Sequence, residues 1–143
     1  MLETPEFFKV MAGKIGTTIH KKRRHYFEVE NENLHEVVTH LYAAMGCRLS
    51  TATATEVYKG IEVLYHFSHD PSGTYYCPRI LMTDKEKPSM NSITPIVPGA
   101  EWIEREMAEL LGIEFIGHPK KVPLLSRNNP DFPDKPLRIR RTT

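Results

Sequence analysis

Apolar side chains recur along the chain with two spacings, one typical of helices and the other of strands. The clearest helical stripe has an apolar residue every three or four positions: Leu34, Val37, Val38, Leu41, Tyr42 and Met45. Asn33 before the stripe predicts the N-cap, and Gly46 after it predicts a left-handed C-terminal residue. A shorter helix is predicted from Pro5 to about Ala12, with Thr4 as its cap.

Alternating apolar and polar positions predict strands. Four segments have this character: residues 17–30, 47–57, 61–69 and 75–82. The sequence Asp-Pro-Ser-Gly at positions 70–73 is typical of a tight turn and predicts an antiparallel hairpin between the last two strands. Because Pro78 has no backbone N–H, the last strand is expected to lie at a sheet edge or to bend at this proline.

A polar, proline-containing connection at residues 83–98 is followed by a third predicted helix at about residues 100–111. This order of elements indicates an α+β fold, with a mixed or antiparallel sheet and helices packed on one face. The fold is expected to occupy residues 1–117 and to be followed by an extended, proline-rich arm at residues 118–143. The arm has seven Lys/Arg and two Asp/Glu, a net charge of +5, whereas residues 1–117 carry about −4.

Composition excludes several kinds of site. The 143 residues contain no apolar run near the roughly 18 residues that cross a bilayer. Nor does the N-terminus have a secretory pattern, so a water-soluble, cytoplasmic chain is expected. Cys47 and Cys77 have no CxxC spacing, which favours two free buried thiols over a disulfide and excludes an ordinary four-cysteine iron–sulfur cluster. The histidine pairs lack a chelating spacing, so a zinc site is not expected.

The third helix carries an unusual density of charge around the single tryptophan, Trp102. Its predicted apolar side consists of Ile103, Met107, Leu110 and Leu111. Arg105 lies four residues from both Glu101 and Glu109, so the plainest interpretation is a surface helix stabilised by ion pairs. Paired carboxylates can act as general acid and base, but no nucleophile or metal ligand has a matching spacing. A third interpretation is that Arg105 anchors a contact between subunits, since a guanidinium can bridge several carboxylates.

The string EWIEREMAELLGIEFIGHP, residues 101–119, resembles the signature of the 30 kDa subunit family of respiratory complex I. That family includes the small hydrophilic subunit of energy-converting membrane-bound [NiFe] hydrogenases. Matching residues are Glu104, Arg105, Glu106, Gly112, Phe115, Gly117, His118 and Pro119, with Pro136, Leu137 and Arg138 further on. Glu109 stands where members usually have Asp, and Lys120 and Lys121 stand where they usually have an arginine.

The resemblance implies a scaffold subunit without a catalytic site, in an ion-translocating oxidoreductase complex of the hydrogenase or NADH/quinone type. Its members bind no cofactor; the [NiFe] centre or quinone and the iron–sulfur clusters belong to partner subunits. The implied partners are a large catalytic subunit, a small iron–sulfur subunit and, through the complex, membrane subunits. The chain would then be peripheral, at the cytoplasmic face of the cell membrane, with its arm wrapped around the large subunit.

Seven residues are expected to dock on that partner: Trp102, Glu104, Arg105, Glu106, Glu109, His118 and Arg138. Because His118 stands where the helical region ends, one of its ring nitrogens is expected to satisfy a backbone group at the turn; proton transfer beside a partner's redox site is the alternative.

A basic cluster, HKKRRH at residues 20–25, suggests a different function. Together with the tail sequence RIRR it could form a nucleic-acid-binding patch, which makes a small nucleic-acid-binding domain the alternative. The cations are not interleaved with aromatic residues, and a solvated strand end or turn explains them equally well.

Overall fold

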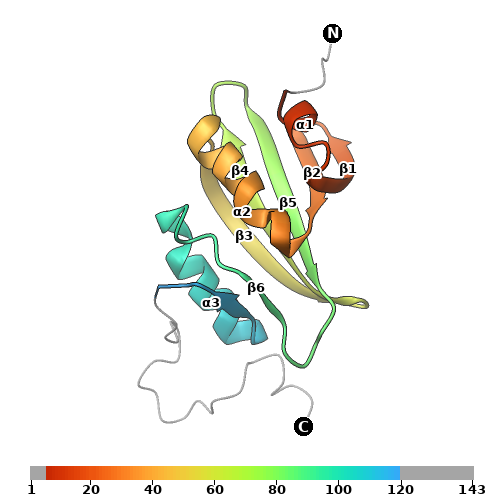
Figure 1. The fold of residues 1–143 in the computed structure, drawn as a ribbon, viewed down its shortest axis with the longest axis vertical. Helices are drawn as coiled ribbons and strands as arrows, with labels where there is room; N and C mark the ends of the chain where they lie inside the picture. The colour runs from red at the N-terminus through yellow and green to blue at the C-terminus, as the bar shows by residue number, and fades with distance from the viewer. Residues whose placement is uncertain (1–5, 120–143) are drawn as a thin grey trace.

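The computed structural model describes residues 6–119 and shows an α+β fold with one main sheet (Figure 1). The five strands of this sheet are β1 (Ile15–Lys21), β2 (Arg24–Val29), β3 (Arg48–Val57), β4 (Gly60–His69) and β5 (Thr74–Met82). Their order is β1-β2-β5-β4-β3. Only β2 and β5 pair in parallel, and the other neighbours are antiparallel, so the sheet is mixed. The α+β class and the mixed sheet were predicted correctly.

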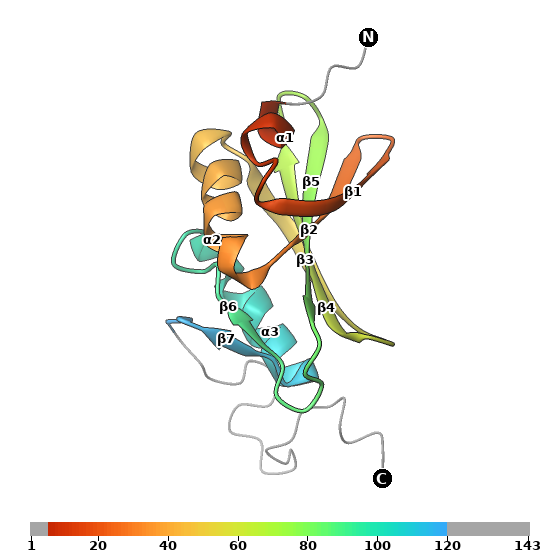
Figure 2. The same cartoon turned by 45° about the vertical axis from the view of Figure 1, so that its right-hand side comes forward.

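The remaining elements of the described residues are helical segments and two short strands. They are α1 (Glu6–Val10), α2 (Asn31–Thr39), the π-helical η1 (His40–Ala44), the 3-10 helix η2 (Pro98–Ala100), α3 (Glu101–Leu111), β6 (Ser89–Asn91) and β7 (Glu114–Ile116). Helices α2 and α3 lie on the same side of the main sheet (Figure 2). Strands β6 and β7 pair in parallel beside α3; β6 lies inside the segment predicted as a plain connection.

The core lies between the sheet and the helices because one face of β2, β4 and β5 is apolar. Its largest fully buried side chains include Phe27, Tyr65 and Phe67. The predicted stripe of α2 faces this core through Leu34, Val37, Val38 and Leu41, which are all inaccessible to solvent. Tyr42 is 38% exposed, whereas Met45, the last residue of the stripe, packs against the core. The stripe therefore identified the buried face correctly except at Tyr42.

Two local predictions need correction. Asn33 is not the N-cap of α2, because the helix begins at Asn31 after Glu30. The side chain of Asn31 accepts the backbone N–H of Asn91 at 2.6 Å, so a tertiary contact sets this helix start. Pro78 is not at an edge, because β5 lies between β2 and β4. The β4–β5 pairing stops at Leu64–Arg79 and resumes in the same register at Phe67–Tyr76, so the proline interrupts the ladder without ending the strand.

Turn chemistry at other positions was predicted correctly. His69 pairs with Thr74 across the 70–73 turn, as the Asp-Pro-Ser-Gly sequence indicated. Gly46, after the helix, has the left-handed φ of 69°. Residues 17–30, predicted as extended, form β1 and β2 with a turn at Lys22 and Arg23, which agrees with the interpretation of the basic cluster as a turn.

Several predictions fall outside the described residues. Thr4 and Pro5, which were expected to begin the first helix, are among them, as is all of the arm after Pro119. The boundary between domain and arm therefore stays a prediction. Within residues 6–119, no helix combines the length and the apolar composition that a membrane crossing requires.

Candidate functional site

Helix α3 has the predicted limits, and its buried face includes Glu104 and Arg105 in addition to part of the predicted apolar side. Gly112 ends it with a φ of 76° and a backbone bond from its N–H to the carbonyl of Ala108. Met107 is buried as expected, whereas the rest of the predicted apolar side is only half-buried. Glu104 and Arg105 are also buried, with 0% and 6% exposure, and Trp102 is 64% exposed. The helix therefore holds charged groups inside and presents its tryptophan to solvent.

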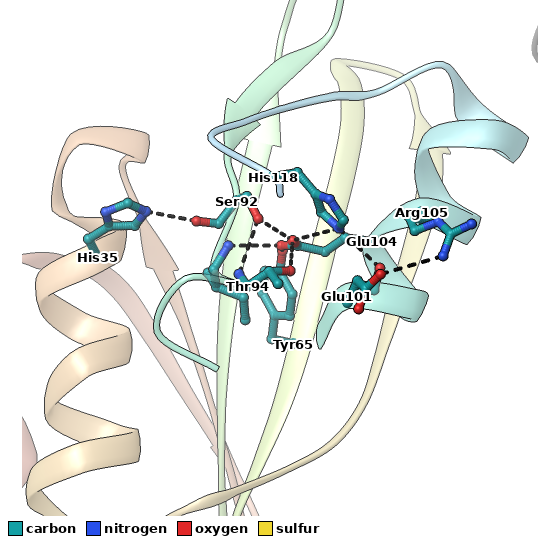
Figure 3. Close-up of polar contacts among 9 residues, drawn as sticks. His35, Tyr65, Ser92, Thr94, Glu101, Glu104, Arg105 and His118 are labelled. Atoms are coloured by element: carbon teal, nitrogen blue, oxygen red, sulfur yellow. Dashed lines mark hydrogen bonds and ion pairs between the residues drawn. The ribbon is translucent and has the colours of Figure 1, made fainter. Parts of the chain in front are cut away.

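The carboxylate of Glu104 is the centre of a buried polar cluster (Figure 3). Oε1 accepts the hydroxyls of Ser92 and Thr94, at 2.5 and 2.7 Å. Oε2 accepts the hydroxyl of Tyr65 at 2.7 Å and the backbone N–H of Ile93 at 3.0 Å. Four donors around one ionised acceptor satisfy a charge that would otherwise be costly to bury. We call Glu104 and these donor residues the Glu104 cluster.

The cluster joins three parts of the fold that are distant in sequence. Tyr65 comes from β4, residues 92–94 follow β6, and Glu104 lies on α3. Burial, followed by the charge and hydrogen bond of Glu104, raises the pKa of Tyr65 well above its usual value, so this hydroxyl stays a donor. The cluster therefore fixes α3 and the loop after β6 on the sheet.

Further bonds hold the loop that carries Ser92. The backbone N–H of Ser92 donates to the carbonyl of Ile116 in β7, and the carbonyl of Ser92 accepts from Nε2 of His35 in α2 at 2.8 Å. Its hydroxyl also accepts the backbone N–H of Thr94 at 3.1 Å. These hydrogen bonds hold the loop in a fixed position beside Glu104.

His118 closes the site from the other side. Its Nε2 donates to the backbone carbonyl of Glu101 at 3.1 Å and lies 4.0 Å from Oε1 of Glu104. A ring nitrogen of His118 satisfies a backbone group, as expected, but this group lies at the start of α3 and not at the turn. Gly117, with a φ of 85°, provides the turn that brings the ring back over the start of α3.

The other docking candidates divide by exposure. Arg105 is buried beside Glu101, with a separation of 3.5 Å between Nη1 and Oε1. Glu106 is exposed, Glu109 is half-buried, and Arg138 lies outside the described residues. Only Trp102 and Glu106 are therefore exposed in the described part of this set, and the docking role of all seven stays a prediction.

Sequence reasoning missed the partners of Glu104. One signal was present, because Glu104 follows the same helical spacing as Met107 and Leu111 and so lies on the buried stripe. A carboxylate there requires buried donors. The sequence did not indicate which hydroxyls would supply them, because Ser92 and Thr94 stand in the segment interpreted as a connection.

The described residues show little that would support chemistry. Within residues 6–119, no group of three or more His, Cys, Asp or Glu side chains is arranged to hold a metal ion. Cys47 and Cys77 are free and buried, and burial raises the pKa of each thiol to about 11. A thiol with such a pKa is a poor nucleophile near neutral pH. The arrangement supports a structural role for the site.

Fold and site together define a small α+β domain, in which a buried carboxylate fixes a surface helix. The fold resembles the Nqo5 trypsin-resistant fragment (1–134), with a TM-score of 0.67 and 20% identity, over 78% of this chain and 93% of that one. It also resembles a chain of the membrane-bound sulfane sulfur reductase, an archaeal respiratory membrane complex, with a TM-score of 0.71 and 21% identity, over 89% and 72%.

The model of the respiratory-chain NADH dehydrogenase 30 Kd subunit family matches residues 27–142, and the chain belongs to this family. The resemblance seen at residues 101–119 is thereby confirmed, and the match extends well beyond that signature. Because the family model covers most of the chain, we assign the chain to this family of respiratory-complex subunits.

Relatives agree with this assignment. The C-type subunit of the NADH-quinone oxidoreductase of Mesorhizobium japonicum is 34% identical over 116 residues, 77% of this chain and 56% of that protein. The corresponding C-type protein of Ruegeria pomeroyi is 36% identical over 98 residues, 64% and 48%. The C/D-type subunit of Bacteroides thetaiotaomicron is 34% identical over 85 residues, 59% and 16%. The matched region thus spans about half the length of the two C-type relatives.

Proposed function

We propose that this chain is a non-catalytic scaffold subunit of a membrane-bound, ion-translocating redox complex, and that it docks on the large catalytic subunit through the exposed side of α3. In this proposal the redox centres, a [NiFe] centre or quinone site with iron–sulfur clusters, belong to neighbouring subunits. The chain itself is peripheral, on the cytoplasmic side of the membrane.

The observation that carries the proposal is the exposure of Trp102 on a helix that the protein holds rigidly. A tryptophan that is 64% exposed offers a large apolar surface, and tryptophan is enriched among the residues that dominate binding energy. Below it, the four donors of Glu104 fix the backbone of α3, so little ordering is required when a partner binds. An anchor presented in this way fits a permanent contact between subunits.

The names of the relatives support a contact between this chain and a large subunit. In the proteins named as C/D-type, a C part and a D part share one chain, and the region similar to this chain is 16% of the Bacteroides thetaiotaomicron protein. A fusion keeps its two parts close together. By the same reasoning, we propose that this chain contacts a separate D-type subunit, which would be much larger than this chain.

The arm is the second part of the proposal. The family match continues to residue 142 and therefore includes Arg138 and most of residues 118–143. From the composition of residues 118–143, with five prolines and a net charge of +5, we expect this segment to bind along the surface of a partner. Binding of nucleic acid, the alternative function, receives no support from the family or from the relatives.

The first experiment compares Trp102→Ala with Tyr42→Ala in the assembled complex. Both remove an exposed aromatic side chain, but Tyr42 belongs to η1, at the other end of the molecule from α3 (Figure 1). We expect Trp102→Ala to weaken association with the large subunit about thirtyfold, the effect of losing a residue worth about 2 kcal/mol. Equal co-purification of the two variants with the large subunit would contradict the docking role of α3.

A second experiment removes the arm by ending the chain after Pro119. The shortened chain is expected to keep its fold, because residues 6–119 form the two sheets, the helices and the hydrophobic core between them, but to lose most of its association with the large subunit. A complex that still assembles with normal yield and activity would show that the arm is dispensable.

A further inference from the structure

The positive charge of the first 117 residues is concentrated at one turn. Lys21, Lys22, Arg23 and Arg24 are consecutive and all exposed at the end of the β1–β2 hairpin. Apart from these four, residues 1–117 contain eight Lys/Arg and sixteen Asp/Glu, a net charge of −8. The turn is therefore a compact cationic surface on an otherwise acidic domain. We call these four residues the basic turn.

Histidines on both sides hold the basic turn in one conformation. The ring of His20 donates from Nε2 to the carbonyl of Lys22 at 2.7 Å, and Lys22 has the left-handed φ of 55°. His20 and His25 stack with their ring centroids 4.0 Å apart. His25 in turn is buried against Phe8, with ring centroids 4.9 Å apart. The basic turn is thus packed against the hydrophobic core through His25.

The two arginines are also positioned by the neighbouring β4–β5 turn. The carbonyl of Arg23 accepts the backbone N–H of Tyr75 at 2.7 Å. Nη1 of Arg23 would lie 3.3 Å from a Cβ added to Gly73, so the guanidinium rests close to that glycine. The guanidinium carbon of Arg24 lies 5.3 Å from the centre of the Tyr75 ring, a cation–π contact. Two guanidinium groups are therefore held in place.

These cations differ from the other arginines that the structure describes. Arg48 pairs with Asp70, Arg79 with Glu28 and Glu62, and Arg105 with Glu101. No Asp or Glu of residues 6–119 lies within ion-pair distance of the basic turn. Within residues 6–119, each of the other arginines has a carboxylate partner, whereas the four cations of the basic turn have none.

We propose that the basic turn is a second docking surface, which binds a carboxylate-rich segment of a neighbouring subunit. Positioned guanidinium groups bind carboxylates in a bidentate geometry that lysine does not reproduce. The hairpin projects at the end of the molecule away from α3 and β7 (Figure 2), so this surface serves a contact separate from the one proposed for Trp102.

Two other polyanions suit the turn less well. Peripheral membrane contacts combine cations with inserted aromatic or aliphatic side chains, whereas the residues next to the four cations are the stacked histidines. Binding to single-stranded nucleic acid uses open aromatic faces, but Arg24 covers the ring of Tyr75. A carboxylate-rich protein segment requires only the fixed guanidinium groups and the surrounding positive charge.

The test on the full chain uses a twenty-residue glutamate homopeptide as the probe. Two double variants separate geometry from charge, since R23K/R24K keeps the charge and K21Q/K22Q removes two charges but keeps both arginines. Peptide binding is expected to weaken about tenfold in R23K/R24K and by a smaller factor in K21Q/K22Q. If K21Q/K22Q weakened peptide binding more than R23K/R24K, binding would depend on net charge alone, and the proposal would be overturned. Tighter binding to phosphatidylglycerol vesicles or to duplex DNA than to the peptide would also overturn it.

A second measurement needs no substitution and so does not depend on how the variants fold. In the purified complex, a carbodiimide joins lysine amines directly to carboxylates that they contact. Lys21 or Lys22 is expected to be joined to an Asp or Glu of another subunit, and to be less reactive toward an amine-acylating reagent than in the free chain. Equal reactivity in the free and assembled states, without such cross-links, would rule out this surface.

Discussion

Replacing Glu104 by Gln tests whether a buried negative charge holds α3 in place. Gln has nearly the same shape but replaces one acceptor oxygen by an NH₂ group. At the Oε2 position this NH₂ would face the backbone N–H of Ile93, a donor that cannot turn away. At the Oε1 position it would face the hydroxyls of Ser92 and Thr94, which can rotate. Gln is therefore expected to place its NH₂ at the Oε1 position.

The expected cost follows from the bonds that change. Two hydrogen bonds to a charged acceptor are lost or reversed, and the two that remain become neutral. At about 1 kcal/mol for each bond lost to the carboxylate, the free energy of unfolding is expected to fall by about 2 kcal/mol. For a chain of this size the melting temperature would fall by about 8 °C. Glu104→Ala, which leaves four buried donors without this acceptor, is expected to cost about 4 kcal/mol or more.

Urea unfolding measures this difference, with Glu106→Gln as the matched control. Glu106 is exposed on the same helix, so the identical chemical change there should alter stability by less than about 0.5 kcal/mol. Adding Tyr65→Phe to both parent and Glu104→Ala gives the coupling between this hydroxyl and the carboxylate, because alanine removes the acceptor altogether. We expect a coupling energy of about 1 kcal/mol for a buried pair that shares a hydrogen bond.

Two results would refute this reasoning. If Glu104→Gln and Glu106→Gln are equally stable, the buried position does not require a charged acceptor. If the effects of Tyr65→Phe and Glu104→Ala are simply additive, the hydrogen bond between the two side chains contributes nothing measurable to stability.

Three further predictions follow from other parts of the structure. Above pH 10, Tyr65 ionises in the unfolded chain but keeps its proton in the folded one, so stability falls as pH rises, by up to about 1.4 kcal/mol per pH unit for this group. Tyr65→Phe should flatten this alkaline decline in urea titrations, and an unchanged slope would contradict the raised pKa. Gly60→Ala should cost about 2 kcal/mol or more, since a Cβ there would lie 2.0 Å from the carbonyl oxygen of Met82. Gly99→Ala is the control, because its Cβ would meet nothing within 4 Å, and equal melting temperatures would refute the close approach. Arg105→Leu should lower both the stability of the isolated chain and the yield of the complex, because Arg105 is only 6% exposed; a normal melting temperature would show that its burial contributes little.

Local patterns predicted most of the fold, because the strands and helices here follow their own periodicity. The hairpin at residues 70–73 and the left-handed glycine at position 46 depend on neighbouring residues only, and they appear as expected. The start of α2 did not, because its position depends on a contact between Asn31 and the distant Asn91. The place of Pro78 in a central strand also depends on tertiary pairing, which the residues around a proline do not specify.

The candidate site could be predicted only in part for the same reason. The position of His118 followed from the turn that contains it, and its ring does bond a backbone carbonyl. For the acidic helix, the charges suggested a solvated surface helix or a subunit contact anchored by Arg105, and neither interpretation included a buried Glu104. The spacing of Glu104 with Met107 and Leu111 indicates the buried side of the helix, but it does not reveal the hydroxyls from β4 and from the loop after β6 that bind the carboxylate there.

The single parallel pairing of the main sheet has a consequence for which part of the protein unfolds locally most easily. Strand β2 joins β5, and between them in sequence lie α2 and the whole of β3 and β4. Closing such a long loop costs entropy before any contact is gained, whereas β3, β4 and β5 assemble through local turns. Pro78 pairs with Phe27 in this seam and has no N–H to contribute. Amide hydrogens of β1 and β2 are therefore expected to exchange faster than those of β4, as the N-terminal hairpin detaches and returns while α3 stays in place.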